Sequence, residues 1–387
     1  MKVAIVHDQL AEFGGAERVL VSIKSLFPDA PVYTTTYDPQ KLGEHAALVK
    51  DWDIRLTWFG KIPIINKLYS PFRFLTPLIW ESLDLKEFDL IISSTGSWMC
   101  KGVITKKPAV HISYIHHPPR YLYGYQTAIE WQKYWPIKIY GLIVNHFLRM
   151  WDFDASQRPD YLIANSIETQ KRIQKFYRRE STVIYPPVSI VTFSNGKTIV
   201  TNPYFVTVSR LARAKHIDLL IETANKEKLS LHIIGKGRDE HYLRSIAGPT
   251  ITFCGNVSDD ELKKEIQGAH AFLFASVDEE FGIAPVEAMG YGTPVIAYAS
   301  GGLEETVKEG INGYLYNDLT ADSLLHSIKQ IESLSKEEYL IMRKNSRKEA
   351  EQYSEENFKK KFMDFVKKIS LPSSQVSLQT PLDRKGR

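Results

Sequence analysis

The sequence has few cysteines, no long apolar run and little net charge, and each scarcity excludes a class of protein. Only Cys100 and Cys254 occur among 387 residues, and they support neither a disulfide framework nor a metal site, which fits a reducing cytosol. No stretch of about 18 uninterrupted apolar residues is present, so no membrane span is expected. The formal net charge of +4 is too small to indicate a nucleic-acid partner.

Three sequence signatures are missing as well. The apolar run after Met1 is too short for a signal peptide and is soon followed by charge. No Gly-x-Gly-x-x-Gly is present, which disfavours a nicotinamide-dependent enzyme. No Asp-x-Asp stands at the end of an expected strand, where it would hold a catalytic metal, so we expect neither a metal nor a cofactor.

What is present centres on one stretch of the second half. Apolar runs at residues 269–275 and 294–299 predict two buried, parallel strands with a loop and a helix between them. Glu279 lies in the loop and Glu287 lies inside the helix, so both can point into the crevice outside the carboxyl ends of the strands. Pro285 suits the first position of that helix. The amides that would be free for an anion at the helix start are those of Gly282, Ile283 and Ala284.

The spacing from Glu279 to Glu287 resembles the E-x7-E motif of retaining glycosyltransferases of family 4. Members of that family usually have glycine after the first acid, where this chain has Glu280. The plainer interpretation is that both acids simply lie near the start of a helix, where a carboxylate stabilises the helix through its dipole. The resemblance covers residues 3 to about 369 and implies the GT-B fold: two doubly wound, Rossmann-like α/β domains facing across a cleft.

Motifs in the first half fit the same family. Residues 3–6 read as a strand, and the Gly-Gly pair at 14–15 leads into a helix, an arrangement in which backbone can approach a phosphate. A lone Gly-Gly is more often just a turn. His116 begins a His-x-Pro-x-Arg-Tyr loop similar to those of bacterial O-antigen mannosyltransferases of family 4. By this resemblance His116 is the active-site histidine, and Arg120 and Asp8 are candidates for the acceptor side.

Motifs in the second half would bind the donor. Arg210 and Lys215 match the family's pair of cations on the donor diphosphate, for which Arg supplies a planar fork and Lys a point charge. Arg213 lies between them and could be the residue that reaches the diphosphate. Solvated surface charge is the alternative for either residue alone. In the family, the loops near Val257 line the pocket for the nucleotide base.

Together these matches imply transfer of a sugar from a nucleoside diphosphate sugar with retention of configuration. The favoured hexose is mannose from GDP-mannose, moved to a lipid-linked or oligosaccharide acceptor in cell-surface polysaccharide synthesis, and a UDP-sugar is the alternative. A catalytically silent nucleotide-sugar-binding subunit of a glycan assembly complex is a further alternative, which the intact set of cations and acids disfavours. The implied catalytic residues are His116, Glu279, Arg210 and Lys215. The implied donor-binding residues are Gly14, Gly15, Arg210, Lys215, Val257, Glu279, Phe281, Gly282, Ile283, Ala284 and Glu287.

Two aromatic and basic segments, 52–80 and 131–151, suit a surface that lies in a lipid interface. Ordinary helices packed on the domain core would explain the same composition. We expect a polyprenyl-diphosphate-linked glycan as the acceptor. We also expect a cytoplasmic protein in peripheral contact with the inner leaflet of the plasma membrane.

The length of 387 residues is long for a single core, so two domains are expected. We place an N-terminal, acceptor-binding domain at 1–195 and a C-terminal, nucleotide-sugar-binding domain at 198–352. The resemblance implies that a last helix, at 353–370, crosses back to the first domain. The polar tail at 371–387 is expected to be disordered.

Overall fold

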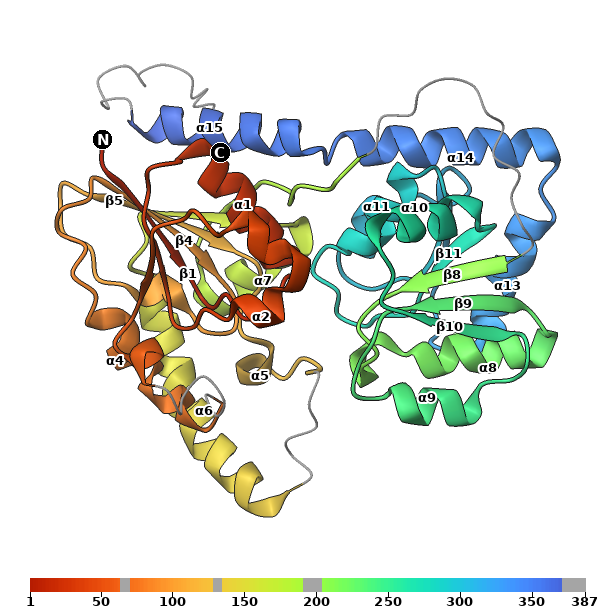
Figure 1. The fold of residues 1–387 in the computed structure, drawn as a ribbon, viewed down its shortest axis with the longest axis horizontal. Helices are drawn as coiled ribbons and strands as arrows, with labels where there is room; N and C mark the ends of the chain where they lie inside the picture. Colours follow the sequence, from red (N-terminus) through yellow and green to blue (C-terminus); the bar gives the residue numbers. More distant parts are fainter. Residues whose placement is uncertain (63–69, 128–133, 191–203, 371–387) are drawn as a thin grey trace, which may run out of the picture.

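The computed structural model describes residues 1–62, 70–127, 134–190 and 204–370. The expected domain boundary at 195–198, the polar tail and parts of both aromatic segments lie outside these residues. The described residues form two α/β domains, each built on a parallel sheet, and a long helix runs along the first domain (Figure 1).

The first domain is doubly wound around a sheet with the strand order β3-β2-β1-β4-β5-β6-β7. Its central strands are buried on both faces, as all six residues of β4 are, because helices cover each side of a parallel sheet. The strands are β1 Val3–His7, β2 Val32–Thr34, β3 Ile54–Leu56, β4 Leu90–Thr95, β5 Val110–Ile115, β6 Tyr161–Ala164 and β7 Thr182–Val183. The helices are α1 Gly15–Leu26, α2 Pro39–Leu42, α4 Thr76–Glu81, α5 Arg120–Tyr123, α6 Trp135–Ser156 and α7 Ile167–Tyr177. Short 3-10 helices are η1 Gly43–Leu48, η2 Phe59–Lys61, η3 Ser70–Leu75 and η4 Cys100–Gly102.

The second domain repeats this pattern with the strand order β10-β9-β8-β11-β12-β13. Its strands are β8 Tyr204–Val208, β9 Ser230–Ile234, β10 Ile251–Gly255, β11 Ala271–Phe274, β12 Val295–Tyr298 and β13 Gly313–Tyr316. Its helices are η6 Arg213–Lys215, α8 Ile217–Glu227, α9 Glu240–Ile246, α10 Asp259–Gly268, α11 Ile283–Gly290, α12 Leu303–Thr306, α13 Ala321–Glu332 and α14 Lys336–Glu351. The predicted pair of doubly wound α/β domains is therefore confirmed.

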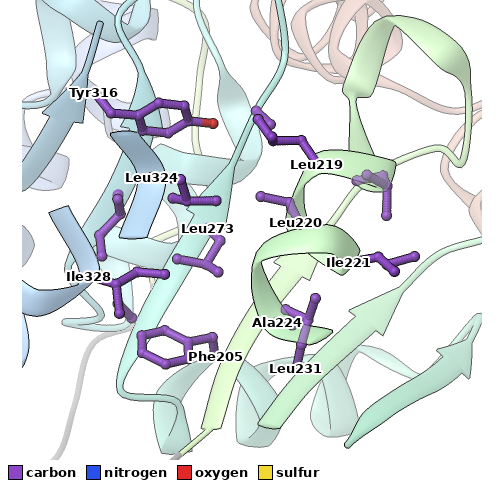
Figure 2. Packing of buried hydrophobic residues seen from close by; sticks show 14 of the residues in the cluster. Phe205, Leu219, Leu220, Ile221, Ala224, Leu231, Leu273, Tyr316, Leu324 and Ile328 are labelled. Atoms are coloured by element: carbon purple, nitrogen blue, oxygen red, sulfur yellow. The ribbon is translucent and has the colours of Figure 1, made fainter. Parts of the chain in front are cut away.

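Apolar residues alternate between the two faces of the second sheet and form a core on each. Leu273 of β11 packs with Leu220 of α8 and Leu324 of α13 on one face (Figure 2). Its chain neighbours Phe272 and Phe274 belong to the core on the other face, which includes α11. This period of two fixes the register of β11, since a slip by one residue would exchange the two faces.

The last helix, α15 Glu355–Ser370, packs on the first domain. Phe358, Phe362 and Val366 recur every four residues and are buried in the first-domain core. Just before this helix, the carbonyl of Tyr353 accepts a hydrogen bond of 2.8 Å from the amide of Val188, where the chain first leaves the first domain. The two places where the chain passes between the domains thus lie side by side. Helix α14 runs along the second domain and α15 along the first (Figure 1).

The strand order reverses between β1 and β4 in the first domain and between β8 and β11 in the second. The connections that follow these two neighbouring strands run to opposite faces of the sheet. The loops at the carboxyl ends of the strands therefore open onto a crevice at each switch point. Most of the sequence-predicted site residues follow β1, β8 or β11, whereas His116 and Arg120 follow β5 and Val257 follows β10. The structure brings the two switch points into contact, as described below.

Candidate functional site

A lysine, a serine and a glutamate meet at the switch point of the second domain. Lys215 ends the turn after β8, and Ser276 and Glu279 follow β11. The Nζ of Lys215 lies 2.6 Å from Oε2 of Glu279 and 3.2 Å from Oγ of Ser276, which donates to the same carboxylate oxygen over 2.7 Å. Burial raises the pKa of Glu279, but Lys215 and the more distant Arg120 outweigh it and leave the pKa below its ordinary value. We call these three residues the switch-point cluster.

The loop that carries Glu279 is fixed by two glycines that follow β12. Gly301 has a φ of +62°, and a Cβ at this position would collide with the carbonyl of Glu279. The amide of Gly302 donates to that same carbonyl over 2.9 Å. Backbone packing therefore sets where the carboxylate of Glu279 stands.

The helix α11 begins at Ile283, so Pro285 occupies its third position and the predicted first position is wrong. Gly282 precedes the helix with a φ of +84°, and proline is tolerated within the first turn because those amides have no partner inside the helix. Glu287 lies inside the helix, and its carboxylate forms an ion pair with Arg18 of α1. Burial raises the pKa of Glu287, and Arg18 opposes that rise only in part.

Gly14 and Gly15 stand opposite α11, across the domain interface. The amide of Gly14 donates to Oε2 of Glu17 over 2.8 Å, within the first turn of α1. A Cβ on Gly15 would collide with the side chain of Ile283. The side chain of Ile283 thus packs against the backbone of residue 15, and a side chain at that position would force it to move.

Asp8 follows β1 and is buried. Its Oδ2 accepts hydrogen bonds of 2.8 Å from the amides of Gly96 and Trp98, and its Oδ1 accepts one of 2.9 Å from the amide of Cys100. Both carboxylate oxygens of Asp8 therefore accept hydrogen bonds from the loop after β4. Asp8 thus shapes that loop, which does not support the predicted acceptor contact.

His116 heads a chain of buried polar side chains that sequence reasoning missed. The Oγ of Ser94 lies 2.8 Å from Nε2 of His116 and 3.1 Å from Nδ1 of His7, and Nε2 of His7 lies 3.5 Å from Oε1 of Glu17. Burial, followed by the proximity of His7, holds the pKa of His116 well below its usual range, so its ring is neutral. Ser94 lies at the carboxyl end of β4, and that position was the one available signal.

The order of donors along this chain follows from its ionised end. The carboxylate of Glu17 favours a proton on the facing Nε2 of His7, which leaves Nδ1 of His7 to accept from the hydroxyl of Ser94. The oxygen of Ser94 then accepts from Nε2 of His116. His116 is thereby left with Nδ1 as an acceptor.

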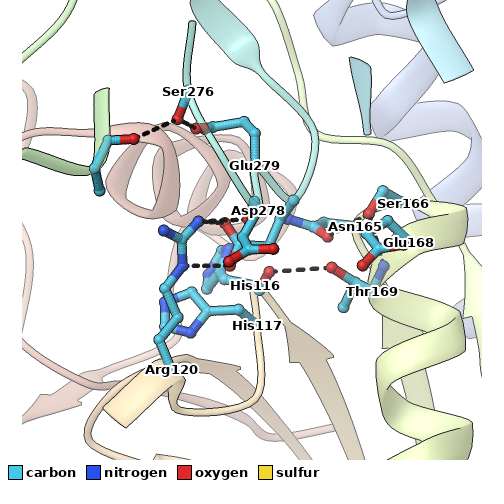
Figure 3. A network of polar contacts seen from close by, with 12 residues as sticks. His116, His117, Arg120, Asn165, Ser166, Glu168, Thr169, Ser276, Asp278 and Glu279 are labelled. Carbon is cyan, nitrogen blue, oxygen red and sulfur yellow. Dashed lines mark hydrogen bonds and ion pairs between the residues drawn. The ribbon is translucent and has the colours of Figure 1, made fainter. Parts of the chain in front are cut away.

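Arg120 points across the interface to the second domain (Figure 3). Its Nε donates to Oε1 of Glu280 over 2.7 Å, and its Nη2 donates to the other oxygen of that carboxylate and, over 2.9 Å, to the carbonyl of Asp278. An acceptor or a phosphate would therefore compete with Glu280 for this guanidinium. The sequence showed Glu280 only as a departure from a family pattern and gave no sign of its partner.

The remaining predicted donor contacts are not paired with the switch-point cluster. Arg210 is half-exposed, and its Nη2 donates over 2.8 Å to Oε2 of Glu12 in the first domain. Arg213 lies 3.8 Å from the carboxylate of Asp218, at the start of α8. Val257 packs against the second-domain core. Among the predicted cations, Lys215 contacts a predicted acid, Glu279.

One group of potential metal ligands lies between β9, β10 and α10. A ring nitrogen of His232, the Sγ of Cys254 and a carboxylate oxygen of Glu265 lie within 4.8 Å of one another. Zinc accepts such a donor set. The Nδ1 of His232 already lies 2.7 Å from Oε2 of Glu265, so two of the three ligands are hydrogen-bonded to each other. The sequence gave no sign of this grouping, because His232 and Glu265 lie 22 and 11 positions from Cys254 in the chain.

Comparison with known proteins connects the second domain to a family. Residues 192–349 match the family model Glycosyl transferases group 1. The chain is 25% identical over 268 residues to the GtfA subunit of UDP-N-acetylglucosamine--peptide N-acetylglucosaminyltransferase from Streptococcus pneumoniae, a match that covers 65% of this chain and 50% of that protein. It is 29% identical over 243 residues to the GDP-Man:Man(3)GlcNAc(2)-PP-Dol alpha-1,2-mannosyltransferase of Mus musculus, covering 54% and 49%. The chain thus spans about half the length of these curated relatives.

A solved structure matches both domains. The crystal structure of Anabaena Alr3699/HepE in complex with UDP and glucose has a TM-score of 0.68 and 19% sequence identity, and the match covers 96% of this chain and 100% of that one. At this identity the likeness concerns the fold. The chain therefore has the GT-B fold predicted from its sequence, and its second domain matches the Glycosyl transferases group 1 family.

Proposed function

We propose that this protein is a retaining glycosyltransferase that moves a hexose from a nucleoside diphosphate sugar without a metal ion. The switch-point cluster carries the proposal, because a lysine and a glutamate meet where parallel α/β domains bind their ligands. The family match covers the same domain and supports the reaction class.

The proposed donor site consists of charged groups whose present partners a donor can replace. Lys215 and Arg210 would bind the diphosphate, Glu279 the sugar hydroxyls and Glu287 the ribose diol. In the structure Lys215 pairs with Glu279, while Arg210 and Glu287 pair with the first domain. A diphosphate that takes over Lys215 would release Glu279 for hydroxyl groups.

In the proposed chemical step the bond between the sugar and the diphosphate breaks. Positive charge then develops on the sugar and negative charge on the departing diphosphate. Loss of one preorganised contact to a developing anion costs about 10²–10³ in turnover, roughly 3–4 kcal/mol. A helix start supplies only ~0.3–2 kcal/mol, so Lys215 and Arg210 should contribute more than the amides at residues 282–284. An oxygen of the leaving diphosphate takes the proton of the acceptor hydroxyl, and neutral His116 accepts a hydrogen bond near the reacting carbon.

The favoured donor is GDP-mannose. The His-x-Pro-x-Arg-Tyr loop that begins at His116 supports it, as does the relative whose name includes GDP-Man. A UDP-sugar is the alternative, since the name of the pneumococcal relative includes UDP-N-acetylglucosamine and the Anabaena protein was solved with UDP.

A thermal-shift series against GDP-mannose, UDP-glucose and UDP-N-acetylglucosamine tests the proposal. A donor present at 100 times its dissociation constant stabilises the folded state by about 2.7 kcal/mol. We expect one donor to raise the melting temperature of the native protein and of Glu12→Gln, and to leave that of Lys215→Met unchanged. No shift with any of the three donors, or equal shifts in all three proteins, would contradict the proposal.

For the acceptor we propose a polyprenyl-diphosphate-linked glycan, reached by peripheral contact with the cytoplasmic face of the membrane. The first aromatic segment is divided in the structure: Phe59, Ile79 and Trp80 are fully buried in the core, whereas Phe74 and Leu78 are exposed. The core explanation therefore holds for part of it, and the exposed part is what we propose to contact lipid. Among the described residues, no helix is both long and apolar enough to cross a bilayer.

The helix α6 supports the membrane proposal most directly. Next to α4 it extends past the body of the first domain (Figure 1), and its first two turns are exposed on nearly every side. Its exposed apolar side chains are those of Trp135, Ile137, Ile139, Tyr140, Leu142, Ile143, Phe147, Met150 and Phe153. The exposed cations of this helix are Lys138 and Arg149. A helix that is apolar on most sides requires a cover, and a bilayer with anionic headgroups provides one for both kinds of side chain.

A further inference from the structure

A buried carboxylate of the second domain is held by two arginines of the first. Glu280 accepts from Nε and Nη2 of Arg120, which lies on α5, and over 3.1 Å from Nη1 of Arg172, which lies on α7. Both guanidinium groups also donate to the carbonyl of Asp278, over 2.9 and 3.1 Å. The carboxylate and the neighbouring carbonyl are thus satisfied by five hydrogen bonds that cross the interface.

The burial of this group determines how much it can contribute. The side chains of Glu280 and Arg172 are 11% and 3% exposed, so salt screens their attraction little. Burial raises the pKa of Glu280, but chiefly Arg120 brings it down to about 2, and the carboxylate stays ionised at neutral pH. Removing one partner of such a buried pair destabilises an interface strongly, because it leaves an ionised group buried without partners.

A second carboxylate reports on the same interface. Glu305 of α12 accepts from the amides of Ile167 and Glu168, over 2.9 and 2.7 Å, at the start of α7. These amides belong to the first turn of a helix and have no partner inside it. The amide of Thr169, in the same turn, donates instead to Ser166 of its own domain, over 3.0 Å. Separation of the domains would expose the first two amides and leave the third bonded.

We propose that Glu280 is a positioning residue that holds the two domains closed in the absence of substrate and thereby places the adjacent Glu279. The carboxylate does not touch the reacting atoms in the proposed function. It fixes the loop after β11 against α5 and α7, and Glu279 is the next residue in that loop. The placement of Glu279 for a sugar rests on the proposed function, whereas the closure of the domains does not.

Amide hydrogen exchange of the ligand-free protein, measured residue by residue by NMR, tests this proposal. Truncating one partner of a buried, hydrogen-bonded charge pair shifts an interface equilibrium by about 30-fold or more. We expect Glu280→Gln to speed exchange at Ile167 and Glu168 by that factor and to leave Thr169 unchanged. The matched control is Glu12→Gln, the same substitution in an exposed interdomain pair with Arg210, which should change none of the three.

Two results would overturn the proposal. One is unchanged exchange at Ile167 and Glu168 in Glu280→Gln. The other is equal acceleration at Thr169, which would mean local unfolding of α7. If Glu280→Gln does not fold, Arg120→Lys keeps the charge and removes the fork, and it should give a smaller acceleration at the same two amides.

Kinetics then separate the proposed role of Glu280 in holding the two domains closed, which we call the clasp, from the proposed function. Wherever transfer is measurable, we expect Glu280→Gln to lower kcat more than it changes KM, because Glu279 is displaced while the donor cations remain. A purely structural role would move the melting temperature and leave this ratio as it was. Since exchange needs no substrate, a protein that closes as described but transfers no sugar would refute the proposed function and not the clasp.

Discussion

The exposed stripe on α6 gives the sharpest test of the membrane proposal. Ile143, Phe147 and Met150 follow one another at helical spacing and are 56%, 61% and 52% exposed. Full burial of such a side chain is worth about 1.5–3 kcal/mol, so burying the exposed fraction of each should contribute roughly 1–2 kcal/mol. The three together should contribute about 3–5 kcal/mol, which corresponds to a change of about 10²–10³ or more in the partition coefficient.

The change to make is therefore the triple substitution of these residues by serine. Its binding is measured by co-sedimentation with vesicles of phosphatidylcholine and phosphatidylglycerol, at low and high salt. The matched control is Ile341→Ser on α14 of the second domain, since Ile341 is 59% exposed and equally apolar. We expect the control to bind as the native protein does and the triple variant to stay in solution with an unchanged melting temperature. Equal binding of all three proteins, or no binding of the native protein, would refute the assignment of this surface to lipid.

Three further predictions concern the interior of the protein. Replacing Lys215 by methionine should lower turnover by about 10²–10³, because a preorganised cation is lost from the developing diphosphate, and a steady-state assay showing less than a twofold loss would contradict that role. Replacing Ser94 by alanine breaks the chain between His116 and His7, so kcat should fall while the thermal shift caused by the donor stays as it was; an equal loss of that shift would mean that the site itself had collapsed. Burial lowers the pKa of His111 to about 3 and that of His116 well below its usual range, so the unfolded chain binds more protons than the native state below pH ~6.5. The contribution of these two histidines to the free energy of unfolding is complete above that pH. As the pH falls below it, the free energy of unfolding decreases by about 1.4 kcal/mol per pH unit for each histidine. Urea unfolding at pH 6 and pH 5 should show a loss of stability in this direction, and His111→Asn should reduce the slope by about 1.4 kcal/mol per pH unit.

The fold could be predicted because its signals are local. Buried parallel strands appear as short apolar runs, and the helix caps stand next to the helices they begin, as Ser166 does when it accepts from the amide of Thr169. The contact between Lys215 and Glu279 was also within reach, because strands on either side of a switch point bring their following loops together. The start of α11 could not be predicted, because the left-handed backbone of Gly282 decides it and no residue pattern at Pro285 shows that conformation.

Partners far apart in the sequence could not be predicted in the same way. Arg120 and Glu280 are 160 positions apart, and either one alone looks like a charge for a ligand. Asp8 shows the same problem, because a lone acid after a strand resembles a catalytic group until the three amides that bind it are seen. Sequence pattern identifies which residues reach an interface, and the packing of the two domains decides which of them are already engaged there.

The ion pairs across this interface differ in how far their side chains are exposed. Arg210 and Glu12 are 57% and 50% exposed, and such pairs contribute about 0–1 kcal/mol, so a phosphate can take over Arg210 at little cost. The pair of Arg18 and Glu287 is only partly exposed, and burial raises the pKa of its carboxylate, which favours an added hydrogen-bond donor such as a ribose hydroxyl. Glu280 and its two arginines, Arg120 and Arg172, form the most buried of these contacts, and none of the proposed donor contacts involves them. The contacts that the proposed donor would replace are therefore the more exposed ones, and the pair that holds the domains together is not among them.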